Sequence, residues 1–178
     1  LDLLNEKCIV NHSCYFGATN NNYTEFDKLD KHRVCGIKLF MGSSTGNMLV
    51  DKMNSLLNIF NGTDMLIAAH CEDQETIKNN IEKYKQKYKG ADDIPISAHP
   101  SIRSVPACYA SSELAVRLAK IAGARLHILH VSTAKELQLF SDEPLANKNI
   151  TAEACVAHLL FTLTHYNSLG ARIKCNPA

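Results

Sequence analysis

Residues 111–133, SSELAVRLAKIAGARLHILHVST, contain a helix pattern, a glycine and a short apolar strand pattern in direct succession. The helix pattern covers Ser111–Ala122, and Gly123 ends it, because glycine readily adopts the left-handed conformation that closes a helix. The strand pattern covers Arg125–Val131, and Val131-Ser132-Thr133 opens another helix. A helix, a buried strand and a further helix in direct order predict an α/β protein with a parallel sheet.

The same alternation extends over the rest of the chain. Five further short apolar runs predict strands: Ser13–Ala18, Gly36–Met41, Met65–Ala69, Ile150–Ala154 and Ala171–Cys175. Apolar residues at helical spacing predict helices over Asn47–Phe60 and Asp73–Lys89, and the irregular stretch Ala91–Ala107 predicts a loop. A doubly wound sheet and part of a (β/α)8 barrel both fit this order, and periodicity alone does not choose between them.

Composition and charge argue against several classes of partner. The balance of 19 Lys and Arg against 18 Asp and Glu gives no electrostatic case for nucleic acid or an anionic membrane. No apolar run approaches the roughly 20 residues of a membrane helix, and the start of the chain lacks a secretory pattern. The seven cysteines are scattered and never form C-x-x-C, which favours reduced thiols in the cytoplasm over a disulfide framework or a zinc ribbon.

Three residues stand in predicted strands or at their ends, where a parallel barrel places its active site. Lys38 lies inside the apolar run 36–42, and burying its ammonium is costly unless it is paired, deprotonated or modified. A lysine that snorkels to the surface is the alternative. His70 and His130 each end an apolar run and precede a helix start. One such histidine is more often a hydrogen-bonded core residue; two in equivalent places favour metal ligands without deciding the matter.

Strand periodicity bears on the choice between His130 and its neighbour His127. Side chains two residues apart share one face of a strand, so Leu126, Ile128 and His130 lie together and His127 points to the other face. If Leu126 and Ile128 face the barrel interior, His130 is the better candidate ligand.

The three residues form a plausible metal-binding set. A buried lysine that stays neutral can react with carbon dioxide to give a carbamate, whose two oxygens can bridge two metal ions. Imidazoles complete the shells of zinc-like ions, and manganese and cobalt also suit such ligands. Two adjacent metals can activate a hydroxide and polarise an amide carbonyl.

Several segments together resemble dihydroorotases of the cyclic amidohydrolase superfamily, in particular the bacterial type with a bridging lysine. The main matches are Gly36–Gly46, Ala69–Glu72 and His127–Thr133, and further ones are Tyr15–Asn20, Glu153–Thr162 and Lys174–Pro177. They run over essentially the whole chain in the right order, which makes the resemblance specific.

The resemblance implies a role for each matched residue. Lys38 is the carboxylated bridging ligand of two divalent metal ions, with zinc the expected metal, and His70 and His130 bind the second ion. Asn176 belongs to the segment that holds the substrate ring, and His158 is structural. The implied reaction is reversible hydrolysis of the ring amide of dihydroorotate to N-carbamoyl-aspartate by a metal-bridging hydroxide, the third step of pyrimidine synthesis. The implied partner is this small-molecule substrate, and a homodimer is allowed for.

Some family features are absent from the sequence. Family members carry a His-x-His pair and an arginine on the first barrel strand, whereas His12 stands alone, and the proton-transfer aspartate belongs to a last strand beyond Ala178. We therefore expect residues 1–178 to be the central part of one barrel domain, with about five or six of the eight βα units, and to be inactive alone. The chain also starts at Leu1 without an initiator Met, which favours two cut ends.

Three alternatives remain open from the sequence. Another cyclic amidohydrolase, such as a dihydropyrimidinase or allantoinase, would share the lysine and histidine ligands. The segments Gly42–Gly46 and Lys174–Pro177 favour dihydroorotase over these. A non-catalytic amidohydrolase-like scaffold and an unrelated doubly wound binding domain are the others.

Two charged features are assigned structural roles. Glu72 and Asp73 are expected to favour a helix N-terminus through its dipole. Arg103 is expected to form a local salt bridge, and the alternative is that it helps to shape the mouth of the site.

Overall fold

The sheet of this protein follows the order of the chain. The computed structural model describes residues 1–42, 46–90, 92 and 94–178. Within these residues, one parallel sheet has the order β1-β2-β3-β4-β5. Its strands are β1 (Cys14–Gly17), β2 (Val34–Phe40), β3 (Ile67–His70), β4 (Leu126–Ile128) and β5 (Ile150–Ala152). A doubly wound sheet reverses its order at a switch point, so consecutive strands indicate an arc of a (β/α)8 barrel instead.

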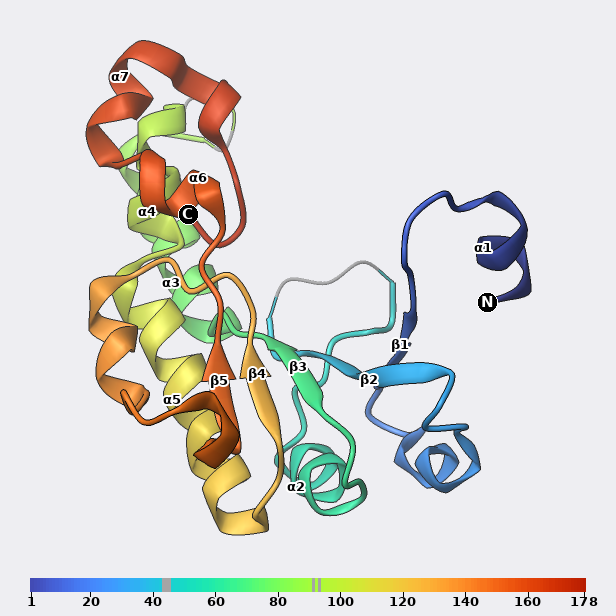
Figure 1. The fold of residues 1–178 in the computed structure, drawn as a ribbon. Coiled ribbons are helices and arrows are strands. Elements are labelled where there is room, and N and C mark those ends of the chain that lie inside the picture. The colour runs from blue at the N-terminus through green and yellow to red at the C-terminus, as the bar shows by residue number, and fades with distance from the viewer. Residues whose placement is uncertain (43–45, 91, 93) are drawn as a thin grey trace.

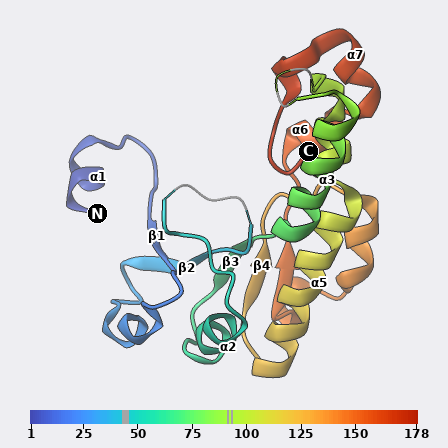
Figure 2. The ribbon, with the colours of Figure 1, turned by 180° about the vertical axis from the view of Figure 1, so that it is seen from behind.

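The helices form two groups around this arc. The α-helices are α1 (Asp2–Lys7), α2 (Met53–Asn61), α3 (Gln74–Lys87), α4 (His99–Ile102), α5 (Val105–Ala122), α6 (Val156–Leu160) and α7 (Tyr166–Leu169). Short 3-10 helices are η1 (Tyr23–Lys28), η2 (Ile96–Ala98), η3 (Ala134–Leu139), η4 (Leu145–Asn147), η5 (Leu163–His165) and η6 (Gly170–Ile173). Figures 1 and 2 show α2 and α5 against one face of the sheet, and α4, α6 and α7 gathered together at one end of it. None of the helices described has the length and apolar character needed to span a membrane.

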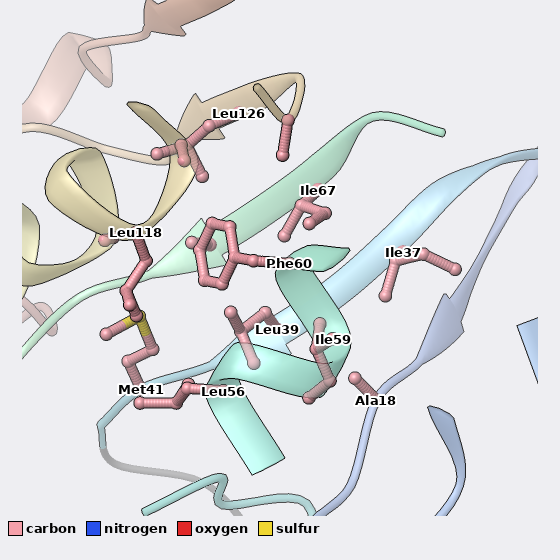
Figure 3. Packing of buried hydrophobic residues seen from close by; sticks show 14 of the residues in the cluster. Ala18, Ile37, Leu39, Met41, Leu56, Ile59, Phe60, Ile67, Leu118 and Leu126 are labelled. Carbon is pink, nitrogen blue, oxygen red and sulfur yellow. The ribbon is translucent and has the colours of Figure 1, made fainter. Parts of the chain in front are cut away.

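The hydrophobic core lies between the sheet and the helices α2 and α5. Ile37 and Leu39 of β2 are fully buried in it and pack with Phe60 of α2, as Figure 3 shows. Because side chains alternate along a strand, Lys38 lies on the opposite face of the sheet. The helix-facing core therefore fixes which side chains line the inner face of the arc.

Three predicted elements differ from the structure. The strand expected over Ala171–Cys175 is wrong: η6 covers Gly170–Ile173, and no strand among the described residues pairs with it. A strand is held by ladder hydrogen bonds to a neighbour, so an apolar run without that neighbour takes a locally bonded turn.

The other two differences concern helix starts. The helix expected from Asn47 begins only at Met53, because the backbone of Val50 donates to Phe40 of β2 over 2.9 Å and holds this stretch extended. The loop expected over Ala91–Ala107 contains η2, α4 and the start of α5. Pro106 fits the first turn of α5, where no backbone donor is needed.

All seven cysteines are free thiols. The residues Ser43-Ser44-Thr45, which contribute to the dihydroorotase resemblance, lie outside the described residues.

Candidate metal centre

Lys38 occupies the inner face of the arc and is half-buried. Its Nζ donates to the carbonyl of Leu39 over 3.2 Å and lies 3.6 Å from the centre of the Phe40 ring. Burial lowers the pKa of Lys38 to about 8, because the charged amine is poorly solvated there. Part of the Lys38 amine is therefore neutral near physiological pH, and the neutral form is the one that reacts with carbon dioxide.

His70 lies on the same face as Lys38, at the end of β3. It is paired in register with Phe40, and the Phe40 and His70 rings are 6.0 Å apart. Its Nδ1 lies 2.9 Å from Nε2 of His130. Two N–H groups cannot point at each other, so at least one of these nitrogens presents a lone pair to the other.

His130 reaches His70 through an unusual backbone conformation. It stands two residues beyond β4 with a φ of 41°, in the left-handed region. Burial, followed by the nearby charges of His70 and Lys38, lowers the pKa of His130 to about 4. The ring is therefore neutral at physiological pH, the state in which imidazole binds metals.

The periodicity argument for His130 rested on a wrong premise. Leu126 and Ile128 do not face the barrel interior: both are buried in the core with the helices, as Figure 3 shows for Leu126. His127 is the residue of β4 that shares the face of Lys38, because both are in register with Ala68 of β3. His130 contacts His70 because its positive φ interrupts the regular alternation of side chains between the two faces of the sheet.

His127 itself is occupied elsewhere. Its Nδ1 lies 2.8 Å from Thr151 Oγ1 and its Nε2 lies 3.2 Å from Glu153 Oε2. Both ring nitrogens are therefore engaged on the β5 side, away from the facing pair of His70 and His130.

The facing histidines fit a metal ion, although they do not complete its shell. Two nitrogen ligands about 2.0–2.1 Å from one tetrahedral zinc ion lie roughly 3.4 Å apart, so the two nitrogens, now 2.9 Å apart, would separate by about 0.5 Å to bind one ion. Among the residues that the structure describes, no group of three or more His, Cys, Asp or Glu side chains is placed to hold a metal. Within the described part of the chain, the two histidines therefore leave the shell of a metal ion incomplete.

A buried ion pair behind His70 was not foreseen from the sequence. Glu72 is fully buried; its Oε2 accepts from His70 Nε2 over 3.0 Å and from Nη1 of Arg103. Burial raises the pKa of the Glu72 carboxyl, but the hydrogen bonds from His70 and Arg103 outweigh it, and the pKa lies below its ordinary value. The spacing of Glu72 from His70 is a weak signal, and nothing local links either residue to Arg103.

Asn176 lies in a separate network near the end of the chain. Its Oδ1 accepts from His99 Nε2 over 3.0 Å, and His99 Nδ1 lies 2.9 Å from the Tyr166 hydroxyl. His158 donates through Nε2 to the carbonyl of Pro177 over 3.1 Å, in line with a structural role. None of these contacts brings Asn176 to His70 or His130.

A cavity of about 500 Å³ is lined by residues that take part in both networks, Arg103 from the first and Tyr166 from the second. Its lining includes Arg103, Ser132, His158, Tyr166 and Cys175. Arg103 therefore binds Glu72, the hydrogen-bond partner of His70, on one side. On its other side it lines a cavity large enough for a small molecule.

Comparison with known proteins gives relatives with related activities. The chain is 27% identical over 177 residues to a dihydroorotase of Methanosphaera stadtmanae, covering 90% of this chain and 38% of the relative. It is 25% identical over 180 residues to an allantoinase of Deinococcus radiodurans, covering 97% of this chain and 38% of the relative. The chain is thus similar over most of its length to a dihydroorotase and to an allantoinase.

The fold comparison agrees with the barrel assignment. The structure of L-hydantoinase (dihydropyrimidinase) from Arthrobacter aurescens matches with a TM-score of 0.82 at 23% identity, covering 94% of this chain and 37% of that one. No family model matches the sequence. The chain thus spans little more than a third of the length of these cyclic amidohydrolases.

Proposed function

We propose that this protein is a dihydroorotase, which reversibly hydrolyses the ring amide of dihydroorotate to N-carbamoyl-aspartate in the third step of pyrimidine synthesis. The observation that carries the proposal is the facing pair of His70 and His130, 2.9 Å apart, at the ends of neighbouring strands. Lys38 stands on the same face of the sheet, and its lowered pKa suits the chemistry of a bridging carbamate. The similarity to a dihydroorotase over 90% of the chain supports the substrate class.

Each residue of the site has a definite task in this proposal. The neutral Lys38 amine adds to carbon dioxide and loses a proton, which gives a carbamate with two ligand oxygens. His70 Nδ1 and His130 Nε2 would hold one of two divalent ions, with zinc the expected metal. Bound divalent ions lower the pKa of water and polarise a carbonyl. Asn176 would position the substrate ring.

The site described so far is half of a two-metal site. Because the chain spans 38% of its relatives' length, we propose that residues 1–178 are the central part of one barrel domain. The ligands of the other ion and the proton-transfer aspartate would then lie in the remaining βα units. By itself the chain would be inactive, and the whole enzyme would work in the cytoplasm, with a homodimer as a permitted assembly.

An activity assay tests the proposed substrate directly. We expect the protein at the full length of its relatives, supplied with zinc, to hydrolyse dihydroorotate in preference to hydantoin and allantoin. Release of the carbamoyl products would be measured for all three substrates, with a sample treated with a metal chelator as the control.

Two other outcomes would contradict the proposal in different ways. Activity on allantoin or hydantoin with none on dihydroorotate would make the protein an allantoinase or a dihydropyrimidinase, and the similarity to an allantoinase over 97% of the chain makes the first a real competitor. Metal binding without activity on any of the three would indicate a non-catalytic scaffold.

A further inference from the structure

Glu72 is a buried carboxylate with a role that helix capping does not explain. Asp73 already caps α3, because its side chain accepts from the backbone of Thr76 over 2.8 Å. Glu72 has no exposed surface, and its two observed partners, His70 and Arg103, meet the same oxygen, Oε2. A carboxylate is buried at a high cost in solvation, so its place here indicates a specific use of its charge.

The position of Glu72 is fixed from both sides. On one side is Gly42, where an added Cβ would lie 2.3 Å from the backbone oxygen of Glu72, so the ends of the two chain segments touch directly. On the other side is Arg103, whose loop is held to α3 because Asn80 Nδ2 donates to the carbonyl of Ile102 over 3.0 Å. Neighbouring segments therefore hold both the Glu72 carboxylate and the Arg103 guanidinium in place.

The contact with Glu72 sets which nitrogen of His70 carries the proton. A carboxylate accepts hydrogen bonds, so His70 Nε2 is the protonated nitrogen and its Nδ1 has the lone pair. That lone pair points toward Nε2 of His130, 2.9 Å away. The other oxygen of Glu72, Oε1, is buried and has no hydrogen-bond partner among the described residues, so both of the contacts observed for the carboxylate are made by Oε2.

We propose that Glu72, held in place by Arg103, is a positioning residue that fixes His70 in the tautomer with a free Nδ1 and so prepares the His70–His130 pair to receive a cation. The metal-binding part of this inference rests on the proposed function. The tautomer part rests only on the hydrogen bonds of the metal-free protein. Carboxylates that orient histidine ligands in this way commonly change metal affinity by about 10- to 100-fold when removed.

The test compares Glu72→Met, which cannot accept a hydrogen bond, with the conservative Glu72→Gln, which can. Long-range proton–nitrogen NMR of the histidine rings in the metal-free protein reports the tautomer. We expect His70 to be protonated at Nε2 in the wild type, to become a mixture of tautomers in Glu72→Met, and to recover in Glu72→Gln. A purely structural role for Glu72 would not produce recovery that follows acceptor capacity.

Cobalt(II) titration of the full-length protein, followed by visible absorption, measures the second consequence. We expect the Kd for cobalt to rise about 10- to 100-fold in Glu72→Met and less in Glu72→Gln. Glu153→Met is the matched control, because Glu153 also accepts from a histidine, His127, over 3.2 Å but stands outside the pair. It should leave the His70 tautomer and the cobalt Kd unchanged.

The two readouts separate the inference from the proposed function. An unchanged His70 tautomer in Glu72→Met would overturn the inference. A wild-type protein that binds no cobalt, with a tautomer that still follows Glu72, would overturn the proposed function and leave the positioning role standing. If Glu72→Met does not fold, a double variant that carries both Glu72→Met and Arg103→Met removes both members of the ion pair and gives the same comparison.

Discussion

Replacement of Lys38 by alanine is expected to lower dihydroorotate hydrolysis by the full-length protein at least roughly a thousandfold. A carbamate on Lys38 would supply oxygen ligands to the metal site, so its loss would remove several kcal/mol of transition-state stabilisation. About 1.4 kcal/mol corresponds to a tenfold change in rate. Steady-state kinetics with metal content measured in parallel would show whether kcat and bound metal fall together.

Two comparisons make the Lys38 result specific. Lys120→Ala, an exposed lysine on α5, should leave the rate unchanged. Added propionate should restore part of the activity of Lys38→Ala, because a small carboxylate can enter the space that the side chain leaves. Full activity of Lys38→Ala without any added acid would rule out the bridging role.

Replacement of Phe60 by alanine is expected to lower the free energy of unfolding by about 3–5 kcal/mol. Phe60 is 1% exposed and packs with Leu39 of the sheet in the core that Figure 3 shows. Because a folded domain is typically stable by only about 5–15 kcal/mol, this change takes much of the total. Chemical denaturation followed by circular dichroism measures it.

The control for Phe60 lies on the same helix. Leu57 of α2 is 36% exposed, so Leu57→Ala should cost about 1 kcal/mol or less. A loss of similar size for both substitutions would mean that α2 does not pack on the sheet as described.

The fold could be predicted from the sequence where local pattern and tertiary packing agree. Ile37 and Leu39 alternate with Lys38, and the structure buries the first two under α2 and leaves the lysine on the inner face. The run Ala171–Cys175 shows the limit, because an apolar stretch becomes a strand only where a neighbouring strand offers hydrogen bonds.

The arrangement of the site could be predicted from the sequence less well than the fold. Strand periodicity favoured His130 from a wrong premise, because Leu126 and Ile128 face the helices. The contact of His130 with His70 depends on a backbone φ of 41° that the sequence pattern does not predict. The bond between Arg103 and Glu72 joins residues far apart in the chain, so only the folded structure reveals it. The resemblance to dihydroorotases named the histidines but gave no reason for their orientation.

Cobalt(II) binding by the full-length protein, compared with that of His130→Ala and His127→Ala, tests the metal centre most directly. His127 lies in β4 and His130 stands two residues beyond it, so the two variants change neighbouring histidines of one segment. The facing pair predicts that His130→Ala loses the absorption of bound cobalt whereas His127→Ala keeps it. Loss in His127→Ala with full binding in His130→Ala would contradict a metal centre built on His70 and His130.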